Sequence, residues 1–122
     1  MQASKVFFDF ERLDVYQKSL NFTNKVFEIS SSFRREIQYS IGDQFRRAAL
    51  SVCNNIAEGS RKTGKSKNQF YGYALDSDRE CIPMISISLT QGQIESIQED
   101  YLRKECVSIT KMLYRLINSI KY

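Results

Sequence analysis

The chain has 122 residues, which is enough for one hydrophobic core but not for two. Apolar residues make up 42% and charged residues 26%, while one proline and five glycines leave little room for the many turns of a β fold. Eighteen basic and 14 acidic residues give a net charge of +4. The composition therefore predicts a single helical domain over residues 1–122 with a modest positive charge.

The sequence lacks the residues and segments that several classes of function require. The sequence has no histidine, and no close group of cysteines or carboxylates replaces it, so we expect no enzyme activity, no metal site and no cofactor. It has no run of 18 apolar residues, so we expect no membrane contact and a cytoplasmic location. The odd number and wide separation of Cys53, Cys81 and Cys106 are typical of core residues in a reducing compartment.

The first predicted helix covers about residues 10–32 and has two apolar stripes on adjacent faces. Together the stripes form an apolar arc that is wider than one neighbouring helix requires. This width indicates either a helix deep in its own bundle or a face that a second subunit covers. The first stripe consists of Leu13, Tyr16, Leu20, Thr23 and Phe27, and the second of Val15, Phe22, Val26 and Ile29.

The second predicted helix covers about residues 37–58 and ends at Gly59. Directly after it, the residues from Gly59 to Ser66 match the phosphate-loop pattern G-x-x-x-x-G-K-[ST]. A phosphate loop follows a buried strand, whereas the apolar residues before Gly59 are three or four positions apart and indicate a helix. No apolar run ending in an aspartate follows the pattern, so we predict that it binds no nucleotide. The apolar residues before it are Ile41, Phe45, Ala48, Val52 and Ile56.

The remaining sequence predicts two more helices. The third begins at Ser66, which has the spacing of a capping box with Gln69, and extends toward Thr90, with a bend at Pro83. The fourth covers about residues 98–121. Three short connections make consecutive helices antiparallel, so we predict an all-α, up-down-up-down four-helix bundle. The core stripe of the fourth helix is Leu102, Cys106, Ile109, Leu113, Leu116 and Ile120.

Polar residues lie close to the apolar stripe of the second predicted helix, and each needs a partner if it is buried. A hairpin centred near residue 62 places Gln44 level with Glu80 or Cys81, so we expect a polar network through Gln44 and Ser77. It also places Arg47 level with Ser77 or Asp78, so we expect an ion pair from Arg47 to Asp78 or Glu80. The network either fixes the helix register or marks a functional site. Its predicted members are Gln44, Ser51, Asn55, Glu58, Ser77 and Glu80.

The excess positive charge is concentrated in one short segment after the second helix. We call this group the basic segment; its members are Arg61, Lys62, Lys65 and Lys67. Without it the chain has 14 basic and 14 acidic residues. Glu58 lies at the negative end of the helix dipole, and we expect Arg61 and Lys62 to hold it. The aromatic residues that follow, Phe70, Tyr71 and Tyr73, are interpreted as core residues rather than surfaces for base stacking.

The run QFRRAALSVCNNIAEGSRK resembles the signature Q-x-R-R-A-x-x-S-I-x-x-N-I-A-E-G of the bacterial ribosomal-RNA intervening-sequence proteins, a four-helix-bundle family. The similarity continues through FERLDVYQKSL, FYGYALDSDRE and ITKMLYRLINSI and covers nearly the whole chain. Asp76, Cys53 and Pro83 depart from the family pattern. The matching residues are Gln44, Arg46, Arg47, Ala48, Ser51, Asn55, Ile56, Ala57, Glu58 and Gly59, with Ser77 and Glu80 on the G-S-x-x-E segment.

The resemblance implies a protomer that assembles into a homopentameric ring, which gives the wide apolar face of the first helix a partner. Relatives include the accessory variability determinant of diversity-generating retroelements, a pentamer that binds nucleic acid and a reverse transcriptase. A ring of five subunits repeats the basic segment five times, which gives a multivalent positive surface that can bind phosphate backbones.

We therefore predict a non-enzymatic homopentamer that binds RNA or DNA or acts as an adaptor, with a reverse transcriptase or an RNA-processing enzyme among its candidate partners. The alternative is a protein–protein scaffold whose basic segment is merely solvated. The candidate nucleic-acid contacts are Arg61, Lys62, Lys65, Lys67, Arg46 and Arg47.

Overall fold

The computed structural model describes residues 7–120, and within this range every regular element is helical. The prediction of an all-α chain is therefore confirmed. Four long helices are joined by short connections, and three shorter helical segments lie among them. In chain order the elements are η1 (Asp9–Arg12), α1 (Asp14–Ser30), α2 (Arg35–Ile37), the π-helical η2 (Gln38–Gly42), α3 (Asp43–Ser60), α4 (Gly64–Thr90) and α5 (Ser96–Asn118).

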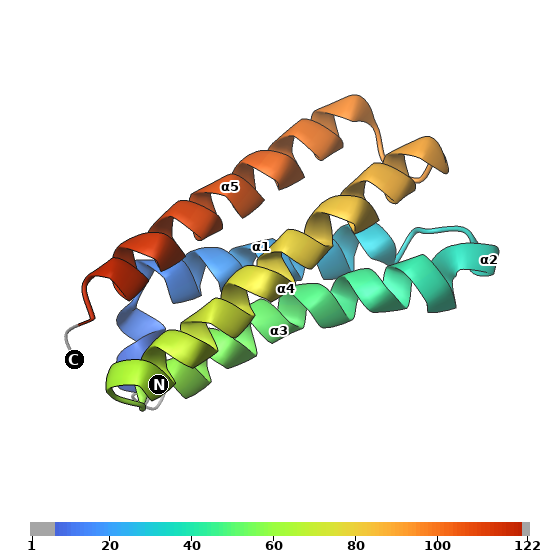
Figure 1. The fold of residues 1–122 in the computed structure, drawn as a ribbon. Coiled ribbons are helices and arrows are strands. Elements are labelled where there is room, and N and C mark those ends of the chain that lie inside the picture. The colour runs from blue at the N-terminus through green and yellow to red at the C-terminus, as the bar shows by residue number, and fades with distance from the viewer. Residues whose placement is uncertain (1–6, 121–122) are drawn as a thin grey trace, which may run out of the picture.

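The four long helices run antiparallel and form a bundle (Figure 1). α3 packs against both α1 and α4, α4 packs against α5, and α1 closes the bundle against α5. Because the connections between these helices are short, each helix reverses the direction of the one before it. This arrangement is the up-down-up-down topology that the sequence predicts.

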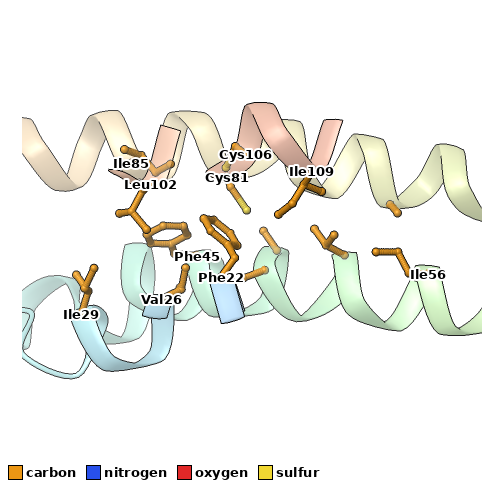
Figure 2. Packing of buried hydrophobic residues seen from close by; sticks show 14 of the residues in the cluster. Phe22, Val26, Ile29, Phe45, Ile56, Cys81, Ile85, Leu102, Cys106 and Ile109 are labelled. Atoms are coloured by element: carbon orange, nitrogen blue, oxygen red, sulfur yellow. The ribbon is translucent and has the colours of Figure 1, made fainter. Parts of the chain in front are cut away.

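The core consists of one apolar stripe from each long helix. Phe22, Phe45, Ile85 and Ile109 are fully buried and come from α1, α3, α4 and α5 in turn (Figure 2). The rings of Phe22 and Phe45 meet edge to face, with centroids 6.4 Å apart. Burial of each such side chain stabilises the fold by about 1.5–3 kcal/mol. The core stripe predicted for the fourth helix is confirmed for Leu102, Cys106, Ile109 and Leu113, which are buried, whereas Leu116 and Ile120 are half-buried.

The three cysteines are buried free thiols, as predicted. Figure 2 places Cys81 of α4 beside Cys106 of α5 in the middle of the bundle. A hydrogen bond with Cys81 and burial raise the pKa of the Cys106 thiol. Both residues therefore act as small core side chains.

The two stripes of α1 have different roles. The stripe of Val15, Phe22, Val26 and Ile29 faces the core. In the other stripe Thr23 is buried, where its hydroxyl donates to the carbonyl oxygens of Ser19 (2.7 Å) and Ala49 (3.1 Å), but Phe27 is 46% exposed. Of the two alternatives that the sequence left open, this exposure favours a face that the protomer itself does not fully cover.

The end of α3 differs from the prediction. The helix does not stop at Gly59 but continues to Ser60, and Gly59 is buried within it. A Cβ atom at Gly59 would lie 2.9 Å from the Tyr71 ring. Glycine is therefore needed here for the close approach of α4, and not to end the helix with a positive φ.

The start of α4 also differs, and the predicted capping box at Ser66 is wrong. α4 begins at Gly64, with the extended residue Thr63 at its N-cap, so Ser66 is already the third residue of the helix. Gly64 has a φ of +54°, which turns the chain two residues earlier than we predicted. The Gln69 amide donates to the Tyr73 hydroxyl at 2.6 Å instead of capping the helix.

The start of the second helix differs as well, whereas the third helix extends to Thr90 as predicted. Residues 38–42 form the π-helical turn η2, so α3 itself begins only at Asp43. Pro83 lies inside α4, and the helix continues past it to Thr90. Gly92, with a φ of +71°, follows the end of α4, where the sequence predicts a break.

Candidate nucleic-acid interface

The basic segment lies at the turn between α3 and α4. Arg61 and Lys62 follow α3, while Lys65 and Lys67 belong to the first turns of α4. Lys67 lines a shallow cavity together with Phe10 of η1 and Leu116 of α5. The segment therefore shares one end of the bundle with both ends of the described chain (Figure 1).

Glu58 neutralises part of the basic segment. Its Oε1 atom lies 2.9 Å from Arg61 Nη2 and 3.5 Å from Lys62 Nζ, as the sequence predicts. The hydrogen bond from Arg61 is the main reason that the pKa of Glu58 lies below its usual value. A carboxylate at the negative end of the α3 dipole is unfavourable by itself, so the two cations stabilise this helix end. Because Glu58 carries one negative charge, the net positive charge at this turn is one unit smaller than that of the basic segment alone.

Lys67 also has a structural role. Its ammonium donates to the Ser60 carbonyl oxygen at 3.0 Å and lies 5.7 Å from the centre of the buried Tyr71 ring. Lys62 lies 5.5 Å from the Phe70 ring. Lys65 is exposed, and within residues 7–120 its charge faces solvent without a recorded protein partner. Lys65 is therefore the member of the basic segment best placed to contact a phosphate.

The aromatic residues that follow the basic segment divide between core and surface. Tyr71 is buried and Phe70 is half-buried, in line with the prediction that they are core residues. Tyr73 is exposed, so the prediction is wrong for this residue. Tyr71 and Phe70 both approach Gly59 of α3, whereas Tyr73, two positions after Tyr71, points in a different direction.

Two further cations lie at this end of the bundle, and the sequence analysis did not identify them as candidate site residues. Arg12, in the last turn of η1, and Arg115, near the end of α5, are both exposed. Arg115 lines a cavity with Leu13 and Leu116, and Leu13 and Leu116 also line the cavity that Lys67 reaches. Sequence spacing gives no signal for this proximity, because it arises from the antiparallel topology. Acidic Asp9 and Asp14 line the same two cavities, so the net positive charge there is modest.

Arg46 does not form part of this interface. Its guanidinium donates to the Ser30 hydroxyl (2.8 Å) and to the Gln38 side-chain and main-chain oxygens (2.7 and 2.9 Å). These bonds tie the end of α1 and the turn η2 to α3. Because Nη1 and Nη2 of Arg46 already donate to these groups and its side chain is only 15% exposed, we leave Arg46 out of the proposed nucleic-acid contacts.

Arg47 is a surface residue. Its side chain is 80% exposed, and Nη2 lies 3.7 Å from Asp43 on the same helix. The predicted ion pair with Asp78 or Glu80 is therefore wrong. The reason is the register of the hairpin, which is centred near residue 64 and not near residue 62, because Ser51 pairs with Ser77.

The predicted polar network is confirmed for three of its members. Ser77 Oγ donates to Ser51 Oγ at 2.8 Å across the α3–α4 contact. Asn55 Nδ2 donates to the carbonyl oxygen of Ser51 at 2.9 Å and to its hydroxyl at 3.1 Å. Gln44 and Glu80 are exposed and lie outside this group, because the shifted register moves them away from each other.

Asp78 is the buried charged residue that sequence reasoning missed. It is only 1% exposed, and its Oδ2 atom accepts a hydrogen bond of 2.6 Å from Thr110 of α5. Burial raises the pKa of Asp78 to about 6. The sequence places Asp78 one turn before Pro83, but it does not show which neighbouring helix the carboxylate faces.

The described chain offers no metal centre and no membrane-spanning element. Within residues 7–120, no three His, Cys, Asp or Glu side chains gather closely enough to hold a metal ion. The helices in the same range are too short or too polar to cross a bilayer.

The fold and the signature residues on α3 define a helical-bundle protein, and comparison with known proteins gives its family. The chain belongs to the 23S rRNA-intervening sequence protein family, whose model matches residues 11–115. This match confirms the resemblance seen in the sequence.

Comparison with solved structures supports the fold. The bundle is similar to the crystal structure of a protein of unknown function from the S23 ribosomal protein family of Bacteroides thetaiotaomicron, with a TM-score of 0.79 and 20% identity. The similarity covers 86% of this chain and 96% of the other. Comparison with curated proteins gives no match.

Proposed function

We propose that the protein is a non-enzymatic, cytoplasmic homopentamer that binds nucleic acid through the phosphate backbone and acts as an adaptor. The observation that carries the proposal is the exposed, basic α3–α4 turn, where Arg61 and Lys65 project at one end of the bundle. Membership of a family named for an intervening sequence of 23S rRNA supports a nucleic-acid context.

Phosphate binding at this turn depends on repetition. One protomer presents few free cations there, because Glu58 pairs with Arg61 and Lys62 and the ammonium of Lys67 is partly used. A ring of five protomers multiplies these contacts, and binding becomes multivalent. Such a surface binds the charged phosphate backbone and does not contact bases specifically, so RNA and DNA are both candidate ligands. A reverse transcriptase or an RNA-processing enzyme is a candidate partner of the adaptor.

The second candidate function is a protein–protein scaffold without a nucleic-acid role. Exposed apolar side chains on α1 and α5 favour it: Phe27, Ile97 and Tyr101. Ile97 and Tyr101 line a cavity between the two helices together with Lys25 and Glu28. An apolar surface with charges at its edge is typical of a protein interface.

Salt-dependent binding distinguishes the two functions. We expect the protein to bind unrelated DNA duplexes and single-stranded RNAs, with log affinity that falls linearly as log salt concentration rises. Replacing Arg61 and Lys65 with Gln should make the slope on duplex DNA shallower by about 1.8 for each subunit in contact. Helicity measured by circular dichroism should not change, because both side chains are exposed and Lys62 still pairs with Glu58.

The matched control replaces Arg35 and Lys104 with Gln. These exposed cations lie on α2 and α5, away from the α3–α4 turn, and their loss changes the net charge by the same amount. We expect this variant to keep the wild-type slope. If the Arg61 and Lys65 variant also keeps the wild-type affinity and slope, the nucleic-acid proposal fails and the scaffold is favoured.

A further inference from the structure

A groove with a volume of about 640 Å³ runs between α4 and α5. Asp78, Cys106 and Thr110 lie on its floor, where the first two are buried and the third is half-buried. Its rim carries exposed side chains from both helices. The rim residues are Gln69, Tyr73, Asp76, Arg79, Val107, Lys111 and Tyr114.

The Asp78 carboxylate is incompletely paired. Oδ2 accepts the hydrogen bond from Thr110, and the Cys106 thiol also interacts with the carboxylate, but Oδ1 is buried and within residues 7–120 no donor meets it at hydrogen-bond distance and angle. The described chain also places no cation within ion-pair distance of it, although Arg79 and Lys111 lie at the rim. A buried carboxylate oxygen without a partner is unfavourable, and a donor from outside the chain would relieve the cost.

The walls of the groove suit an apolar body next to a positive charge. Tyr73 and Tyr114 are both exposed and line the groove from α4 and α5, and Val107 of α5 lines it as well. Aromatic rings attract cations and also pack against aliphatic chains. The volume lies within the range of about 300–1,000 Å³ that is typical of small-molecule sites.

We propose that this groove binds a small organic cation, an ammonium or guanidinium group on an apolar stem, whose charge pairs with Asp78 and whose stem packs against Tyr73 and Tyr114. An anion is disfavoured, because the carboxylate at the floor would repel it. Since Oδ1 is buried, side chains at the rim must shift for the cation to reach it; exposed side chains can do so at low cost. The site does not depend on the proposed nucleic-acid function.

Calorimetry of the whole protein at pH 7.5 tests the site. The probes are isopentylamine and agmatine, which carry an ammonium and a guanidinium group, and the neutral control is isopentanol. We expect both amines to bind saturably at one site per chain, and isopentanol to bind about tenfold more weakly or not at all.

Two variants with the same change in charge test the role of Asp78. Asp78→Asn should weaken amine binding about tenfold or more, because the amide is neutral and has nearly the same shape. Asp76→Asn, at the exposed rim of the same groove, should change the affinity by about twofold at most. Equal losses in the two variants would show general charge attraction and would overturn the proposal.

A second readout uses wild-type protein and does not depend on how the variants fold. The carboxyl ¹³C signal of Asp78 should titrate near the pKa of about 6, and bound amine should lower that pKa. Other charged or titratable groups near Asp78 are Asp76, Arg79 and Cys81 on α4, and Cys106, Lys111 and Tyr114 on α5. No saturable amine binding, or an Asp78 signal that amine does not move, would overturn the proposal.

Discussion

Asp78 should make the stability of the bundle depend on pH. The pKa of this carboxyl is about 6 in the folded chain, against an ordinary value of 3.8, because burial disfavours the charged form. The folded state therefore binds more protons than the unfolded state between these values. It follows that the contribution of Asp78 to the unfolding free energy falls as pH rises through this window and is least favourable above pH 6.

Replacement of Asp78 by Asn removes this titration. We expect Asp78→Asn to be more stable than wild type at pH 8, by about 2–3 kcal/mol, and the difference to shrink toward pH 4. Urea unfolding at pH 4, 6 and 8 measures it, and comparison of the two proteins cancels the other carboxylates. A difference that is constant over this range would contradict the assignment.

Gly59 is a second position where a single atom matters. A Cβ atom there would meet the buried Tyr71 ring at 2.9 Å, so Gly59→Ala should destabilise the bundle by about 1–3 kcal/mol despite the better helix propensity of alanine. Gly72→Ala is the matched control, because that position in α4 has no atom within 4 Å of the added Cβ. It should stabilise by up to about 1 kcal/mol in the same urea experiment. If both changes stabilise, the contact with Tyr71 does not restrict residue 59.

At the scale of elements, Arg46 joins α1, η2 and α3. Arg46→Gln removes hydrogen bonds to Ser30 and Gln38, and we expect a loss of about 1.5–3 kcal/mol. Arg47→Gln removes the same charge from an exposed side chain, so its effect should lie within about 0.5 kcal/mol. Thermal unfolding of the two variants tests this contrast. Equal stability losses would show that net charge, and not the hydrogen bonds, explains the role of Arg46.

Apolar periodicity predicted the long helices, because residues three or four apart share a helix face whatever the neighbouring helices do. Apolar periodicity could not predict which residues of α3 and α4 lie level with each other, that is, the register of this helix pair. That register depends on the positive φ of Gly64 and on the Gly59–Tyr71 contact, which are properties of the folded chain. The error of about two residues at this turn misplaced the partners of Gln44, Arg47 and Asp78.

The candidate site was predictable only in part. The pairing of Glu58 with Arg61 and Lys62 follows from spacing along one helix end, so the sequence was sufficient. The proximity of Arg12 and Arg115 and the burial of Asp78 depend on how distant helices pack. Sequence spacing carries no information on such contacts.

For the whole molecule, the exposed part of the α1 apolar arc predicts self-association. We expect sedimentation at micromolar concentration to give a mass several times the 14.2 kDa of one chain, with five copies as the proposed number. Phe27→Glu should shift the protein toward the monomer while circular dichroism stays helical, because Phe27 lies on the surface of the protomer.

The control for this experiment is Tyr39→Glu, which places the same charge at the most exposed large aromatic residue of the described chain, outside α1. It should leave the mass unchanged. A wild-type protein that sediments as a monomer would remove both the ring and the multivalent binding that depends on it.

The position of the chain ends affects how this protein should be handled in binding experiments. Asp9, Phe10, Ser119 and Ile120 line one cavity with Lys67, so both ends of the described chain lie beside the basic α3–α4 turn. A purification tag, fluorophore or surface tether on either end would be held close to the proposed phosphate contacts and would obstruct them. The connection at residues 91–95, at the opposite end of the bundle, is the better attachment point (Figure 1).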